Sequence, residues 1–197
     1  MSGTDAIWRA STLLRQRIGA AVEGGDGSIQ LSPPKTENDQ AGADFSLWLY
    51  RLIENEHQKN VPSQRVGEAR LRPTPLVLDL YYLLTPLGAN EETRQLRLGE
   101  AMRAIHAAPI IRSDPPDAAE REAEDDGRLG FREELHVQLF RLGLEELTRI
   151  WESLSQPLRL SVVYQVRFIR LDLPASAAPA PVTDRRVGST AETEGAL

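Results

Sequence analysis

Histidine is the side chain most often used for metal binding and proton transfer near neutral pH, and this chain contains three of them. They are His57, His106 and His136, and each lies in a different segment of the sequence. None has the H-E-x-x-H spacing, or a similar ligand spacing, that would bring two imidazoles together. We therefore expect three separate, partly exposed histidines and no shared metal site.

Covalent hydrolase chemistry also lacks its usual residues. The sequence has no cysteine, and no serine has the G-x-S-x-G neighbours of a nucleophile elbow. The glycine-rich segment from Gly24 to Ser28 lacks the lysine of a phosphate-binding loop and precedes a predicted strand rather than a helix. We interpret this segment as a turn.

Two groups of carboxylates invite a functional interpretation. The segment from Glu122 to Glu133 has the acidic spacing of a calcium-binding loop, but it begins with Glu and is followed by a strand-like pattern instead of a helix. Glu54 and Glu56 could form an acid and base pair if they shared a strand face. A solvated strand end explains them better, so we predict no catalytic residue, no cofactor and no metal.

The spacing of apolar residues predicts alternating helices and strands. Two segments are apolar at both odd and even positions, which is typical of central strands with both faces covered. Asn90 is a good N-cap for the helix that follows it. The predicted helices are 7–22, 91–107 and 144–154, and the predicted strands are 29–31, 45–54, 76–85, 135–141 and 158–172.

This order of elements predicts a single α+β domain, with a mostly antiparallel or mixed sheet of about five strands and about three helices packed on it. The domain should cover 1–173, followed by a flexible Ala/Pro-rich tail at 174–197. The last strand, 158–172, would be roughly 50 Å long at about 3.3 Å per residue, longer than such a domain is wide. We expect part of it to leave the sheet.

Composition restricts the class of partner. A net charge of −6 argues against nucleic acid as the main ligand, because duplex phosphate requires a clustered basic face. The weakly charged run from Pro73 to Asn90 contains Asp79 and three prolines, so we expect no membrane insertion. Without cysteines or a signal-peptide pattern, the sequence predicts a cytoplasmic location.

Three segments carry a specific resemblance: FSLWLYRLIENE at 45–56, PLVLDLYYLLTPLG at 75–88, and GLEELTRIWESLSQPLRLSVVYQVRFIRLD at 143–172. Together they resemble the N-terminal domain of the cap, or tail-terminator, proteins of extracellular contractile injection systems, which are phage-tail-like particles. The likeness runs from the first helix to Asp172. Larger members of that family carry further sequence where this chain ends in a short tail.

The resemblance implies a ring of six subunits that lies on the last layer of the inner tube and sheath and stops their polymerisation. It implies no catalysis, and the partners would be the chain itself and the tube and sheath proteins. Two alternatives remain: a monomeric adaptor that binds a partner through long loops at 32–44, 55–73 and 110–130, and a small enzyme with an unrecognised site.

Candidate interface residues follow from the strand patterns. The neighbouring residues Tyr81 and Tyr82 must point to opposite faces of their strand, and we choose Tyr81 as the one that faces outward. Arg159, Arg167 and Arg170 carry charges that cannot belong to an apolar core. These four residues are our predicted contacts with a neighbouring subunit or with the tube and sheath.

Overall fold

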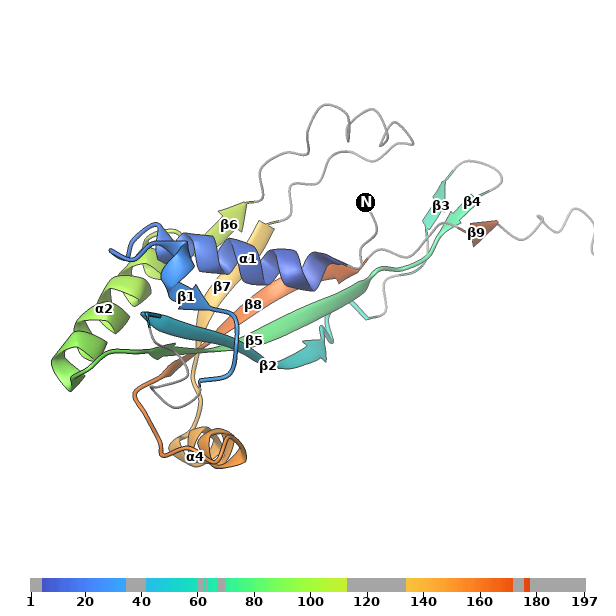
Figure 1. Cartoon of the computed structure of the whole chain (residues 1–197). Helices are drawn as coiled ribbons and strands as arrows, with labels where there is room; N and C mark the ends of the chain where they lie inside the picture. Colours follow the sequence, from blue (N-terminus) through green and yellow to red (C-terminus); the bar gives the residue numbers. More distant parts are fainter. Residues whose placement is uncertain are drawn as a thin grey trace, which may run out of the picture.

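The computed structural model describes residues 5–34, 42–59, 62, 64–66, 70–112, 134–171 and 176–177. These residues form an α+β fold whose order of elements follows the predicted order (Figure 1). The elements are α1 (Ala6–Gly19), the short 3-10 helix η2 (Asp26–Ser28), β1 (Ile29–Gln30), β2 (Phe45–Glu54), β3 (Gln64–Val66), β4 (Arg70–Arg72), β5 (Leu76–Pro86), α2 (Glu91–Ala107), β6 (Ile110–Arg112), β7 (Glu134–Phe140), α4 (Leu144–Ser153), β8 (Val162–Leu171) and β9 (Ser176–Ala177).

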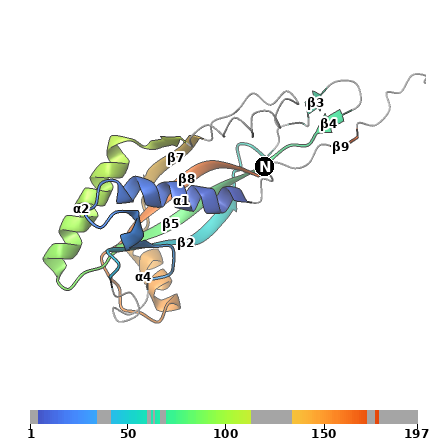
Figure 2. The same ribbon diagram turned by 45° about the horizontal axis from the view of Figure 1, so that its top comes forward.

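The main sheet has six strands in the order β1-β2-β5-β8-β7-β6. Only β1 and β2 run parallel, and the other neighbours are antiparallel, which confirms the predicted mixed sheet with one strand more than expected. A second sheet, β3-β4-β9, lies beyond the end of the main sheet that is remote from α2 (Figures 1 and 2).

Helices cover the two faces of the main sheet unequally. Alternate residues of β5 point to opposite faces, with Leu80 and Tyr82 on one side and Tyr81 and Leu83 on the other. We call the first side the α1/α2 face and the second the α4 face, after the helices that pack there (Figure 2). The α1/α2 face holds the larger apolar core, so most of the hydrophobic stabilisation comes from this side.

Local signals fix the helix boundaries. The side chain of Asn90 accepts a hydrogen bond from the Thr93 N–H at 2.8 Å, which caps α2 at the predicted residue. Helix α1 ends three residues earlier than predicted, at Gly19, where an added Cβ would lie 2.4 Å from the Asp26 backbone. The turn after α1 therefore passes so close to the last residue of the helix that only a glycine fits there.

The prediction of a long strand at 158–172 is wrong for residues 158–161. Strand β8 begins at Val162, and ten residues span only about 33 Å, so it fits within the sheet. Leu158 and Leu160 continue the apolar alternation but are exposed. The reason is the return path from α4, whose Trp151 Nε1–H donates to Ser161 Oγ at 3.2 Å and holds this segment beside the helix.

Two predicted loops contain strands. The segment 55–73 includes β3 and β4, and the segment 110–130 begins with β6. Strand β7 also departs from its pattern, because Leu139 should be buried with Leu135 and Val137 but is exposed. The described helices include none that is long and apolar enough to cross a membrane. The predicted cytoplasmic location stays a prediction.

Candidate interaction surface

Half of the α4 face is an aromatic cluster beneath α4. The rings of Tyr81 and Phe140 lie 5.0 Å apart in an edge-to-face arrangement, and the Tyr50 ring lies 6.5 Å from Tyr81. Helix α4 closes this cluster with Trp151, which is fully buried. The Arg51 guanidinium lies 5.3 Å from the centre of the Tyr81 ring, so a cation borders the aromatic half.

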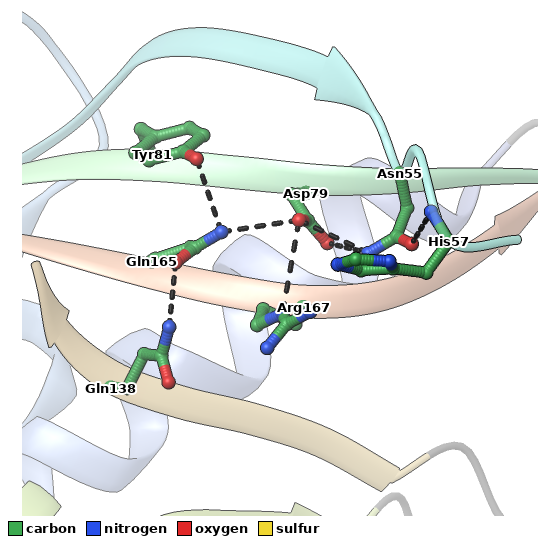
Figure 3. Close-up of polar contacts among 7 residues, drawn as sticks. All are labelled: Asn55, His57, Asp79, Tyr81, Gln138, Gln165 and Arg167. Carbon is green, nitrogen blue, oxygen red and sulfur yellow. Dashed lines mark hydrogen bonds and ion pairs between the residues drawn. The ribbon is translucent and has the colours of Figure 1, made fainter.

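The other half of the α4 face carries a row of polar side chains centred on Asp79, which is only 5% exposed (Figure 3). Asn55 Nδ2–H donates to both carboxylate oxygens of Asp79, at 3.0 and 3.1 Å. Gln165 Nε2–H donates to Asp79 Oδ2 at 3.1 Å, and Arg167 Nε lies 3.8 Å from the same oxygen. We call Asn55, Asp79, Gln138, Gln165 and Arg167 the polar row.

A β-bulge brings Arg167 to Asp79. Along β5 and β8, Leu78 pairs with Ile169 and Leu80 pairs with Val166, so two residues of β8 lie opposite Asp79. The extra residue in β8 is a bulge, which turns a side chain out of its regular alternation. Register between β5 and β8, rather than proximity in sequence, therefore sets the geometry of the row.

The row extends from Asn55, just after β2, across β5, β8 and β7 through amide side chains. Gln165 Nε2–H also donates to the Tyr81 hydroxyl at 3.1 Å, and Gln138 Nε2–H donates to Gln165 Oε1 at 2.6 Å (Figure 3). Burial, followed by the negative charge of Asp79, raises the pKa of Tyr81 above its ordinary value, so this hydroxyl stays protonated at neutral pH. Amide donors and a fixed carboxylate suit binding and rigidity better than proton transfer.

Three of the four predicted interface residues share the α4 face. Tyr81 is buried under the aromatic half, Arg167 belongs to the polar row, and Arg170 is exposed two strand positions beyond Asp79, opposite Val77. Arg159 precedes β8, where its Nη2–H donates to Gln156 Oε1 at 3.5 Å. Their contacts with a neighbouring chain stay a prediction, while the burial of Tyr81 shows that it packs within the subunit.

The histidines and carboxylates that the sequence offered as candidate catalytic or metal-binding residues lie in separate places. His57 is in the turn after β2, His106 in the last turn of α2 and His136 in β7. Across the described ranges, no group of three His, Cys, Asp or Glu side chains could hold a metal ion. Strand β2 ends at Glu54, which pairs with Lys59 at 3.2 Å, so Glu56 lies in the following turn. The calcium-like segment, 122–133, lies outside the described residues.

Sequence reasoning missed the central members of the polar row. The available signal was Asp79 itself, a single charge inside an apolar strand, because a buried carboxylate requires partners from neighbouring strands. Its partners Asn55 and Gln165 are separated from it by 24 and 86 residues. Neither spacing follows from periodicity, so only the strand register identifies them.

Comparison with known proteins gives matches in sequence and in fold. The sequence profile of the Pvc16 N-terminal domain matches residues 11–185. No curated protein matches the chain in sequence.

The solved structures that share the fold include two terminator or cap proteins. The sheath/tube terminator of an extracellular contractile injection system (PVC), in its extended state, superposes with a TM-score of 0.62 and 18% identity over 97% of this chain and 65% of that one. The tube-terminating cap of the anti-feeding prophage (AFP) gives a TM-score of 0.55 and 17% identity over 91% and 60%. The chain thus spans less than two thirds of either structure's length.

Proposed function

Because the chain belongs to the Pvc16 N-terminal domain family, we propose that it is a structural cap, or tail terminator, of a contractile injection particle. The observation that carries this proposal is the profile match over 11–185, which includes nearly all of the described fold. The fold shared with two proteins that terminate tubes supports it. The predicted resemblance rested on segments within the same range.

We propose that the chain acts as a ring, with six subunits, on the last layer of tube and sheath. A ring needs a heterologous contact, in which two different surfaces of one subunit meet their counterparts on the two neighbours. The α4 face provides one candidate surface, since α4 covers its aromatic half and leaves Arg170 exposed beside the polar row. Arg159, Arg167 and Arg170 remain the proposed interface residues, and Tyr81, which packs beneath α4, would support this surface from within the subunit.

We also propose that the role is not catalytic. The polar row consists of a carboxylate, three amides and a guanidinium, and Tyr81, whose pKa is raised, is the one hydroxyl hydrogen-bonded to it in Figure 3. Such a set contains no serine, cysteine or lysine that could act as a nucleophile, and its one carboxylate accepts hydrogen bonds from two amides. Fixed amide and guanidinium donors instead favour a rigid surface of defined charge.

Removing the protein from cells that assemble the particle tests the proposal directly. Electron microscopy of the particles should show sheathed tubes of variable, greater length, because polymerisation would lack its stop. Supplying the wild-type chain from a plasmid should restore uniform length and exclude effects on neighbouring genes. Particles of uniform, normal length in the deletion strain would refute the terminator function.

Native mass spectrometry separates the ring from a monomeric adaptor. Rings should appear at high protein concentration or after addition of tube fragments, since the family role requires contact with a tube end. A protein that remains monomeric in both conditions, and does not sediment with tubes, would favour the adaptor.

A further inference from the structure

An apolar groove opens on the α1/α2 face, between the C-terminal half of α2 and strands β7 and β8. Its volume is about 570 Å³, which lies within the range of about 300–1,000 Å³ that is usual for binding sites. Ile105, Val137 and Tyr164 are its buried lining residues, and Met102 and Leu139 are more exposed. We call it the α2/β7 groove. Because Leu139 is 56% exposed, the subunit alone leaves part of this apolar surface uncovered.

The polar groups of the α2/β7 groove are cationic or neutral. Arg103 and His106 are exposed on α2, and none of the described lining residues is a carboxylate. The Tyr164 side chain is 3% exposed, and its hydroxyl forms no hydrogen bond with a described residue. Burial raises the pKa of Tyr164 to about 12, so the hydroxyl is protonated at neutral pH and can donate a hydrogen bond. The groove therefore suits an apolar side chain that is accompanied by a carboxylate.

The start of α4 presents such a pair of groups on the opposite face of the sheet (Figure 1). Leu144 is 71% exposed, although it continues the apolar stripe of Leu147 and Trp151 that packs on the sheet. The Glu146 carboxylate lies at the same end of the helix, because the Gly143 N–H donates to its Oε2 at 3.3 Å. A leucine and a carboxylate are thus exposed together at this end of α4.

The charges on the two surfaces can pair with another chain. Glu145 differs from its neighbour Glu146, since it already pairs with Arg149 at 2.6 Å. Among the described residues, neither Glu146 nor Arg103 belongs to an ion pair. A contact that brings Glu146 to Arg103 therefore joins two opposite charges without breaking an existing ion pair.

We propose that the start of α4 of one subunit occupies the α2/β7 groove of the next subunit. Leu144 then lies between Met102 and Leu139, with Glu146 near Arg103. The contact covers both Leu144 and Leu139, which are largely exposed in the single subunit. This inference rests on the proposed ring and deepens it by naming the two surfaces that meet.

The positions of the two surfaces make the contact heterologous. Helix α4 and the α2/β7 groove lie on opposite faces of the main sheet (Figure 2). A two-fold contact, in which one surface meets its own copy, therefore cannot place both copies of Leu144 in grooves. Each pair of subunits retains one empty groove and one uncovered α4 start, to which further subunits can add. The assembly becomes a ring where the rotation between subunits closes.

Engineered cysteines test this contact in a chain that has no native cysteine. Met102→Cys and Leu144→Cys cannot join within one subunit, because α2 and α4 pack on opposite faces and each layer adds about 10 Å. A disulfide requires Cα atoms less than about 7 Å apart. Mild oxidation of the double variant should therefore give a ladder of covalent oligomers on non-reducing gels.

Matched variants define the outcomes of the cross-linking experiment. Each single cysteine variant should give no ladder, and neither should Trp8→Cys combined with Leu144→Cys, although Trp8 is 65% exposed. Rings in native mass spectrometry without a Met102 to Leu144 ladder would overturn this contact and leave the terminator function standing. A normal particle length in the deletion strain would overturn the function independently of any cross-link.

Substitutions on the two surfaces provide a second readout. Glu146→Arg or Arg103→Glu alone should weaken self-association about tenfold, and the double variant should restore most of it. Leu144→Ala should also weaken self-association about tenfold. Leu96→Ala is the matched control, because Leu96 is 65% exposed on α2 but does not line the groove, and it should leave self-association unchanged.

Two results would contradict the contact, provided that all variants are folded. Failure of the double charge variant to recover self-association would refute the placement of Glu146 near Arg103. Equal self-association of the Leu144→Ala and Leu96→Ala variants would show that Leu144 lies outside the groove of the next subunit.

Discussion

The two faces of the main sheet bury different chemistry. Under α1 and α2 the buried side chains are almost all apolar, including Leu80 and Val166, which are fully inaccessible. On the α4 face the helix covers an aromatic cluster, and beside it the buried side chains are Asp79, Asn55 and Gln165. One face is a conventional core, and the other combines a core with a polar network.

This difference indicates that the α1/α2 face mainly stabilises the fold, whereas the α4 face positions charged groups at the surface. Apolar burial stabilises a fold without fixing a particular chemistry, so the α1/α2 face can be built from many combinations of Leu, Ile and Val. A buried carboxylate lowers stability unless every partner is in place, which makes the polar row depend on β5–β8 register. The row thus holds Arg167 in place next to the exposed Arg170.

The largest expected effect is on the α1/α2 face. Leu80→Ala should lower the free energy of unfolding by about 3–4 kcal/mol, because it removes a fully buried side chain and leaves a cavity. Urea denaturation followed by circular dichroism measures the change. Leu52→Ala is the control on the same face and strand pair, and it should cost under about 1 kcal/mol because Leu52 is half exposed. Equal costs would contradict this account of the core.

Asp79→Ala should lower the free energy of unfolding by about 2–3 kcal/mol, somewhat less than Leu80→Ala. The substitution leaves the buried amides of Asn55 and Gln165 without their acceptor and removes the carboxylate near Arg167. Asp79→Asn keeps the shape and one acceptor oxygen, and should cost about 1 kcal/mol. Urea denaturation followed by circular dichroism measures both changes. An Asp79→Ala variant as stable as wild type would show that the polar row does not stabilise the subunit.

Sequence patterns predicted the elements that local signals determine. Strand β2 and helix α2 have the predicted bounds, since β2 is apolar on both faces and α2 begins at a side-chain cap on Asn90. The start of β8 was predicted four residues too early, because Leu158 and Leu160 continue the apolar alternation of the strand. Nothing local marks the point at which the chain leaves α4 for the sheet.

The polar row could not be predicted from sequence beyond Asp79. Its geometry requires the bulge opposite Asp79 and the pairing of β7 with β8, and both depend on register between distant segments. Exposure of Leu139 has the same origin, because β6 begins opposite His136 and therefore does not extend alongside Leu139. Periodicity identifies which residues share a face, but it does not show how far a neighbouring strand or helix extends.

A smaller effect is expected in alkali on the α1/α2 face. Burial raises the pKa of Tyr82 to about 12, and the hydrogen bond with Ser11 offsets this only in part. In the unfolded chain the pKa of a tyrosine is about 10. The stabilisation linked to the protonated Tyr82 is therefore fully present below that pH, and it is lost as the pH rises through the folded pKa.

By pH 12 the wild-type chain should have lost about 2 kcal/mol from this group alone, and Tyr82→Phe should lack that part of the slope. Urea denaturation of both proteins between pH 9 and pH 12 measures the difference. Ser11→Ala tests the partner and should keep the slope, because the phenol remains buried. Parallel pH profiles for wild type and Tyr82→Phe would show that Tyr82 titrates normally.

The smallest effect on stability, under about 0.5 kcal/mol, is expected at the exposed end of the α4 face. There Arg170→Glu replaces one exposed side chain with another. Self-association measured by native mass spectrometry should nevertheless weaken, since the proposed interface loses a cation and gains an anion. Arg149→Glu, exposed on α4, is the matched control and should leave association intact. If Arg170→Glu and Arg149→Glu assemble alike, Arg170 lies outside the ring contact, and the polar row serves the fold of the subunit alone.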